Sequence, residues 1–270
     1  TGSTEGETIL SMNNKDEVLS DVRVRRAIMH AIDRQALIDG AMSGYGTPIG
    51  THFAPHNPAY LDLTGVYAFD QAKARALLLE AGYDNDLELT LHLPPPSYAR
   101  RGGEIIAAML SEVGVTAKIE NVEWASWLEN VYRAKNYDLT IVSHVEPMDI
   151  GRIYSDPGYY IQYDSQEFRD IFKKFEVAGT VEEQTKYLQQ AQRKVTEDAA
   201  VGYLFQLAKL GVVKKGLTGK PVHCHREVML SSSSSDHTCL ASEGGAALDG
   251  QEVRCRVGGS MTTRLLSVLL

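Results

Sequence analysis

The sequence predicts an α/β fold, in which a mostly parallel mixed sheet is flanked by helices. Amphipathic helical patterns alternate along the chain with short apolar runs that are typical of β-strands. Parallel strands need a crossover between them, and a helix is the usual crossover. The hydrophobic share of 43% and the charged share of 23% are those of an ordinary globular protein, so composition contradicts none of this.

Five segments carry one helical pattern, with apolar residues at positions i, i+3, i+4 and i+7 on a single helix face. These segments are 24–31, 74–81, 106–113, 124–131 and 168–175. Asp21, Asp33 and Asp70 are expected to cap helix N-termini, because an aspartate carboxylate can accept from the free backbone N–H groups there. Gly82 and Gly114 stand where a helix would end in a left-handed residue.

Strand-like runs lie between these helices, at 87–93, 115–122 and 138–143. A long polar helix at 181–199 and an apolar run at 201–207 continue the alternation. The character changes after about Lys220, where aromatic residues are absent and five serines occupy 231–235. We therefore expect a disordered leader at 1–7, a folded body at 8–220 and a disordered, irregular tail at 221–270.

Charge and hydropathy exclude some classes of partner. The net charge is −8, with 35 acidic and 27 basic residues, which does not favour a nucleic-acid backbone. No apolar run reaches the roughly 20 residues of a membrane-spanning helix. The chain opens at Thr1 without a methionine or a secretory signal, so we expect the start of the natural protein to lie upstream.

Three groups of residues resemble ligand sites, but their context does not support them. Glycines at 44, 46 and 50 follow a helix and precede prolines, so they do not form a phosphate-binding loop. His52 and His56 flank Pro55, which prevents a regular helix, and are expected to be surface loop histidines. The tail carries soft metal ligands without a zinc spacing: His223, Cys224, His225, His237 and Cys239.

The segment 143–163 is the strongest candidate site, because it begins where a predicted strand ends. Open α/β sheets bind ligands beyond the carboxyl ends of their strands. Carboxylates there could accept charge-assisted hydrogen bonds from an ammonium group, and tyrosines could cover apolar surface. The alternative is a solvated loop with tyrosines in the core. The candidate ligand-binding residues are His144, Glu146, Met148, Asp149, Tyr154, Tyr159 and Tyr160.

The stretch DVRVRRAIMHAIDRQALIDG, at 21–40, resembles the signature that opens the second lobe of family 5 extracellular solute-binding proteins. These are the dipeptide, oligopeptide and nickel receptors of ABC importers. The similarity continues through the GYGTP loop and through 69–83, 104–129, 137–149 and 197–217. It covers roughly residues 8–217, and the tail departs from the family pattern.

The resemblance implies a periplasmic-binding-protein-like lobe of type II that binds short peptides or similar small polar solutes, without catalytic residues or a cofactor. It implies that an ABC importer permease is the partner of the full-length protein, which would be periplasmic or extracytoplasmic and membrane-anchored. Glu146 or Asp149 would meet a peptide's terminal amine. Two other classes remain open: an α/β enzyme, hydrolase-like or nucleotide-dependent, and a metal-binding interaction module acting through the tail.

Overall fold

The computed structural model describes residues 1–146 and 148–211, all within a compact unit that spans Thr1–His225. The strands are β1 (Gly2–Met12), β2 (Gly46–Pro48), β3 (Leu87–Leu93), β4 (Val115–Asn121), β5 (Leu139–His144) and β6 (Val201–Lys209). The helices are α1 (Val22–Ala31), α2 (Arg34–Met42), α3 (Gln71–Glu80), α4 (Ser97–Ser111), α5 (Trp124–Ser126), α6 (Ile150–Ser155), α7 (Gln166–Val177) and α8 (Val181–Glu197). A π-helical segment, η1 (Trp127–Arg133), directly follows α5.

The six strands form one mixed sheet in the order β2-β6-β1-β5-β3-β4. Parallel pairing is confined to β4-β3-β5, while β1 is antiparallel to both β5 and β6, and β2 is antiparallel to β6. The α/β class is confirmed, but the expectation of a mostly parallel sheet is wrong, because the central strand β1 runs against its neighbours. The disordered leader expected at 1–7 is also wrong. These residues carry no apolar pattern, and their order comes from backbone pairing with β6.

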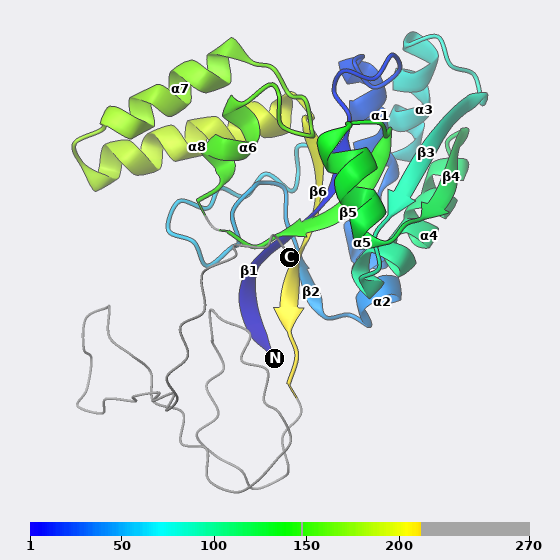
Figure 1. Cartoon of the computed structure of the whole chain (residues 1–270), viewed down its shortest axis with the longest axis horizontal. Helices are drawn as coiled ribbons and strands as arrows, with labels where there is room; N and C mark the ends of the chain where they lie inside the picture. The colour runs from blue at the N-terminus through cyan, green and yellow to red at the C-terminus, as the bar shows by residue number, and fades with distance from the viewer. Residues whose placement is uncertain (147, 212–270) are drawn as a thin grey trace, which may run out of the picture. The chain divides into compact units, whose positions relative to one another are not determined.

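Helices cover both faces of this sheet, with α1 to α4 on one side and α6 to α8 on the other (Figure 1). Successive strand residues point to opposite faces. On β1, Leu10 packs with the helices α1 to α4, and Ile9 packs with the tyrosine-rich core under α6 to α8. On β6, Leu204 likewise packs with α1 to α4, and Tyr203 packs in the tyrosine-rich core. Two separate cores therefore lie back to back, an aliphatic one and an aromatic one.

The predicted helix ends are confirmed. Asp21 accepts a hydrogen bond from the backbone N–H of Arg23, and Asp70 accepts one from that of Lys73. The Asp33 carboxylate accepts two such bonds at the start of α2. Gly82 and Gly114 have φ of 98° and 85°, the left-handed conformation expected after a helix.

Two buried arginines explain much of the signature at 21–40. The guanidinium of Arg25 donates to the backbone carbonyls of Leu19, Asp198 and Ala199, at 2.6 to 3.0 Å. Arg34 donates to Tyr203 O at 2.7 Å and to the carbonyl of Tyr67 at 3.0 Å. Each side chain thus ties α1 or α2 to the strand β6 or to the turn before it, and each buried N–H finds an acceptor.

The segment 124–131 differs from the regular helix that its spacing predicts. The helix widens into η1, where the N–H of Ala134 bonds to Glu129 O, five residues earlier. The wider turn brings Trp127 and Tyr132, which are also five residues apart, into a stacked ring contact. Trp127 is buried and donates from its indole to Thr140 Oγ1 at 2.9 Å. The π-helical turn therefore carries the side chain that contacts β5.

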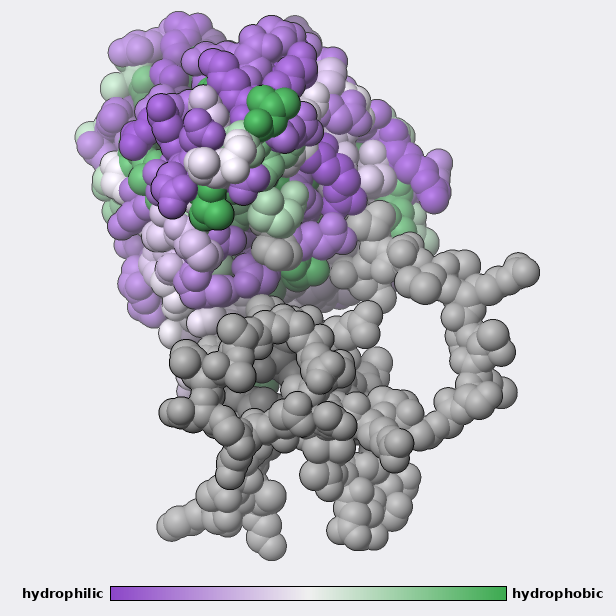
Figure 2. Space-filling model, turned by 90° about the vertical axis from the view of Figure 1, so that its left-hand side faces the viewer, coloured by the Kyte–Doolittle hydropathy of each residue, from purple (hydrophilic) through white to green (hydrophobic). Residues whose placement is uncertain are grey.

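The outer face of α7 and α8 is mostly hydrophilic, with small, separate hydrophobic spots (Figure 2). Phe168 of α7 and Leu188 and Val195 of α8 point inward to the aromatic core. Among the described residues, no helix combines the length and hydrophobicity that crossing a membrane would require.

Candidate functional site

The candidate site lies at the carboxyl end of β5, which is parallel to β3 and β4. His144 ends β5, and Asp149 directly precedes α6. The antiparallel strand β1 places Glu7 directly opposite His144 in the sheet. Glu7 shares a strand face with Ile9, which packs in the aromatic core, so its carboxylate is directed toward that core.

The loop that follows β2 brings His52 to the same place. Ile49 and Phe53 are buried in the aromatic core on either side of it. Gly50 allows the loop to pass close to another backbone segment, because a Cβ atom at this position would lie 2.2 Å from the carbonyl carbon of Leu63. The glycine thus serves close packing, and His52 is carried inward.

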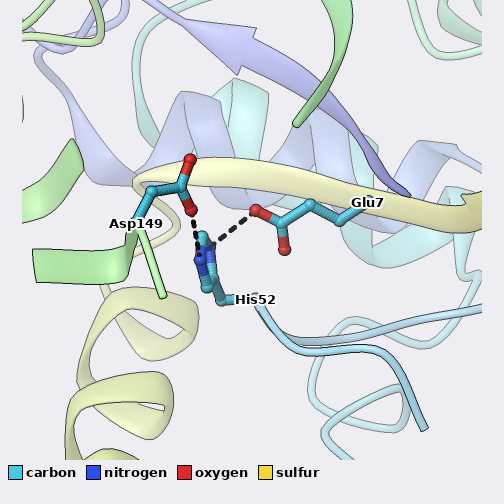
Figure 3. A group of neighbouring side chains, drawn as sticks. All are labelled: Glu7, His52 and Asp149. Carbon is cyan, nitrogen blue, oxygen red and sulfur yellow. Dashed lines mark ion pairs between the residues drawn. The ribbon is translucent and has the colours of Figure 1, made fainter. Parts of the chain in front are cut away.

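Glu7, His52 and Asp149 form a buried charged group (Figure 3). His52 Nδ1 lies 2.7 Å from Glu7 Oε1, and His52 Nε2 lies 2.9 Å from Asp149 Oδ1. The side chains are 1 to 3% exposed. Both Glu7 oxygens, Asp149 Oδ1 and His52 Nδ1 are buried and have no partner outside this group. The contacts of the His52 ring with the two carboxyl groups are therefore the interactions that hold this group together.

Asp149 connects this group to the candidate segment. Its Oδ2 lies 3.5 Å from His144 Nδ1 and 3.5 Å from the guanidinium of Arg152. His144 Nε2 is 3.0 Å from the Tyr160 hydroxyl, and the two rings are stacked. Arg152 also contacts the exposed carboxylate of Glu146 at 3.3 Å. A continuous set of polar contacts thus runs from the sheet to the surface.

The pKa values follow from burial and from the neighbouring charges. Burial raises the pKa of Glu7 to about 8, and attraction to His52 offsets this only in part. Burial alone would lower the pKa of His52, but the carboxylates of Glu7 and Asp149 outweigh it and raise that pKa to about 9. Burial likewise opposes ionisation of Asp149, yet His144 and His52 hold its pKa below the usual range. Near neutral pH, His52 is therefore an imidazolium beside an ionised Asp149.

A metal ion is the other species that such residues can hold, and the geometry favours it less. Glu7, His52 and Asp149 offer ligand atoms within 4.8 Å of one another. However, the two carboxylates face different nitrogens of the His52 ring. A metal ion takes the lone pair of one nitrogen, so only one carboxylate could bind the metal beside His52, and the other would accept from the opposite ring N–H. An imidazolium between Asp149 and the Glu7 carboxyl group accounts for both contacts without a metal ion.

The seven candidate residues differ in exposure. The Glu146 side chain is 63% exposed and Met148 is 54% exposed, so these two reach the surface. His144 and Asp149 lie directly behind them. Tyr154, Tyr159 and Tyr160 are buried, and the hydroxyl of Tyr154 contacts that of Tyr203 at 2.9 Å. The tyrosines therefore form the packed base of the segment rather than its surface.

Sequence reasoning missed Glu7 and misplaced His52. Glu7 falls in the stretch expected to be a disordered leader, and His52 was expected to be a surface histidine but is 3% exposed. The apolar residues Ile49 and Phe53 on either side of His52 are the one sequence signal that indicates a buried loop. His56 fits the expectation, with a side chain that is 40% exposed. The candidate metal ligands of the tail lie outside the described residues.

Comparison with known proteins identifies the family. The profile of "Bacterial extracellular solute-binding proteins, family 5 Middle" matches residues 1–210. The chain therefore belongs to the family 5 bacterial extracellular solute-binding proteins. The members of this family are extracellular solute-binding proteins.

Individual relatives match shorter stretches. The dipeptide-binding protein of Escherichia coli is 36% identical over 132 residues, which is 47% of this chain and 24% of that protein. Heme-binding protein A of Haemophilus influenzae is 32% identical over 136 residues, which is 48% of this chain and 24% of the relative. The matched part is thus about a quarter of the length of these curated relatives.

Solved structures confirm the fold over more of the chain. The oligopeptide-binding protein of Bacillus subtilis, in complex with a nonapeptide, superposes with a TM-score of 0.71 at 19% identity. The superposition covers 76% of this chain and 45% of that one. The fold is thus that of one part of a periplasmic-binding-protein-like structure.

Proposed function

We propose that this chain supplies one lobe of the solute-binding component of an ABC importer, and that the solute is a short peptide or a similar small polar molecule. The family match supports the binding role. The relatives are named for dipeptide and heme, and a structural neighbour holds a nonapeptide, so small solutes with polar groups are the shared theme. The superposition covers less than half of the solved chain, so a second lobe would close over the solute.

One observation carries the location of the solute site. A charge network at the carboxyl end of β5 runs from the buried Asp149 through Arg152 to the exposed carboxylate of Glu146, and Met148 in the same segment is also exposed. Glu146 is held by Arg152 at 3.3 Å but remains mostly exposed, so it can accept a hydrogen bond from an ammonium group. Met148 offers apolar contact.

Asp149 takes an indirect role in this proposal. Its side chain is 3% exposed, and its two oxygens face cationic or ionisable groups, His52 on one side and His144 and Arg152 on the other. We infer that Asp149 orients the site from behind, with His144, while Glu146 meets the solute. Tyr159 and Tyr160 support the segment from the core.

The rest of the assignment follows from the family. We propose an extracytoplasmic location for the full protein, periplasmic or anchored to the membrane, and an ABC importer permease as its partner. A single lobe provides part of the contacts and none of the closure, so this chain alone should bind solute weakly.

The test is calorimetry on the longer protein that carries this lobe, titrated with a library of short peptides. Glu146→Gln should weaken the affinity for peptides with a free terminal amine by about tenfold, the value of one lost charge-assisted hydrogen bond. N-acetylated peptides should bind the two proteins equally. The matched control is Glu129→Gln, which removes an exposed carboxylate paired with Arg133 on η1. Equal losses in both variants, or none in either, would remove Glu146 from the site.

A further inference from the structure

The Glu7, His52 and Asp149 group joins three segments that are far apart in the sequence. Glu7 lies on the central strand β1, His52 on the loop after β2, and Asp149 at the start of α6. The loop carrying His52 is anchored in the core, and β1 is held by both neighbouring strands. Asp149, by contrast, sits between the end of β5 and the short helix α6. Its fixed partners are therefore on the sheet side of the site.

We propose that Glu7 and His52 are positioning residues of the solute site. In this proposal, the His52 imidazolium, which has the Glu7 carboxyl group on its other side, holds Asp149, and through Asp149 it holds the segment from His144 to Tyr160. The inference rests on the proposed function only in calling that segment the solute site. The network itself can be tested without any solute.

The contacts show how the effect of His52 reaches the surface. His52 faces Asp149 Oδ1, which leaves Asp149 Oδ2 for His144 and Arg152. Arg152 contacts Glu146, and His144 contacts Tyr160. If Asp149 loses its partner on the sheet side, both branches lose their common support. The exposed carboxylate then no longer has a defined position.

The groups around the network determine its response to pH. Glu5 on β1, His144 on β5, Arg152 and Tyr154 on α6, and Tyr203 on β6 all act electrostatically on Glu7, His52 or Asp149. Among these neighbours, the permanent cation Arg152 lies on the Asp149 side. His52 is therefore the cation that faces Glu7.

The sign of the pH dependence follows. The folded state keeps the Glu7 proton up to a pKa of about 8 and the His52 proton up to about 9, whereas unfolded Glu and His lose theirs near 4.5 and 6.5. The folded network therefore binds more protons than the unfolded chain between these values, and its contribution to stability falls as the pH rises. Above pH 9 two unshielded buried carboxylates remain, so the segment should loosen.

Hydrogen exchange on the full 270-residue chain tests the positioning role. At pH 6, His52→Gln should speed amide exchange in residues 144–160 by about tenfold or more, as expected for a lost local constraint. Helix α3, in the aliphatic core, should keep its exchange rates. The matched control is His56→Gln, which changes an exposed histidine of the same loop that pairs with Glu5. Exchange that is equally unaffected in both variants would overturn the proposal.

The pH profile separates positioning by charge from simple packing. After correction for intrinsic rates, exchange in 144–160 should rise in the wild type between about pH 4.5 and about pH 9, the window between the unfolded and folded pKa values of Glu7 and His52. Glu7→Gln should remove the part of this rise below pH 8. If His52→Gln unfolds the chain, the comparison of wild type with Glu7→Gln still tests the proposal. Identical pH profiles of exchange in these two proteins would contradict the network.

Nitrogen NMR of the histidine rings gives a measurement that needs no stable variant. At pH 7.5 both His52 ring nitrogens should carry protons. A neutral ring would overturn the proposal, and so would zinc ions that bind at micromolar concentration and displace those protons. Failure of solute binding in the longer protein would leave these outcomes unchanged, so the network and the proposed function can fail separately.

Discussion

The two faces of the sheet are held by different physical means. On the side of α1 to α4, aliphatic side chains fill the core. The buried arginines Arg25 and Arg34 donate their hydrogen bonds to backbone carbonyls there. On the side of α6 to α8, tyrosines fill the core, and buried ionisable groups face one another. On the first face, burial lowers the pKa of His30 in α1, so this face should gain stability as the pH rises through the ordinary range of histidine. The second face should respond to pH, and it carries the candidate site.

The largest effect should come from breaking the network on the second face. His52→Gln leaves the ionised carboxylate of Asp149 buried without the imidazolium that faces it, and breaking a buried pair in this way costs about 3–5 kcal/mol. The loss should be greatest below pH 6.5 and shrink as the pH rises through about 9, because the wild-type folded state then gives up its extra proton. Urea unfolding at several pH values measures it. A loss that is independent of pH would contradict the role of charge.

A large-to-small substitution in the core of the first face should lower the free energy of unfolding by nearly as much. This loss should not depend on pH. Leu91 of β3 is fully buried in the aliphatic core. Leu91→Ala should lower the free energy of unfolding by about 2–5 kcal/mol through lost burial and a residual cavity. Urea unfolding should give the same loss at pH 6 and pH 9. A strong pH dependence would show that the two faces are not independent.

A smaller effect tests the tyrosine core. Tyr154 and Tyr203 share a buried contact between hydroxyls at 2.9 Å. Tyr154→Phe should cost about 1–3 kcal/mol, because it leaves the Tyr203 hydroxyl buried without this partner. The double variant Tyr154→Phe and Tyr203→Phe should recover part of that loss. Thermal unfolding of the four proteins completes the cycle, and additive losses would show that the hydroxyls do not depend on each other.

The smallest effect is at a helix end on the first face. Asp70 caps α3 by accepting from the Lys73 backbone N–H at 2.9 Å. Asp70→Ala should cost about 1 kcal/mol, while Asp70→Ser should retain most of the stability because serine also caps well. Thermal unfolding at neutral pH compares the two variants. Equal losses for serine and alanine would mean that the cap contributes little.

Sequence alone predicted the first face better than the second, for a physical reason. Helices α1, α3 and α4 bury a regular stripe, and local signals such as the aspartate caps and Gly82 mark their ends. The first half of the central strand β1 has no such apolar pattern, and it is ordered by backbone pairing with β6. A strand of this kind is visible only when its partner is known.

The candidate site shows the same division. The segment after β5 could be predicted, since it follows a strand and is rich in polar and aromatic residues, and His144 and Asp149 do lie together there. The partners of Asp149 on the sheet side could not be predicted. Glu7 and His52 are 45 residues apart by their numbers and reach each other only because β1 and the loop after β2 converge in the fold.

We propose that solute binds at the carboxyl end of β5, over the aromatic core. Hydrogen exchange of the longer protein, with and without a saturating short peptide, measures where the solute lies. We expect added protection in residues 144–160, around Glu146 and Met148, and none in α1 or α3. Protection confined to α1 and α3, with residues 144–160 unchanged, would contradict it.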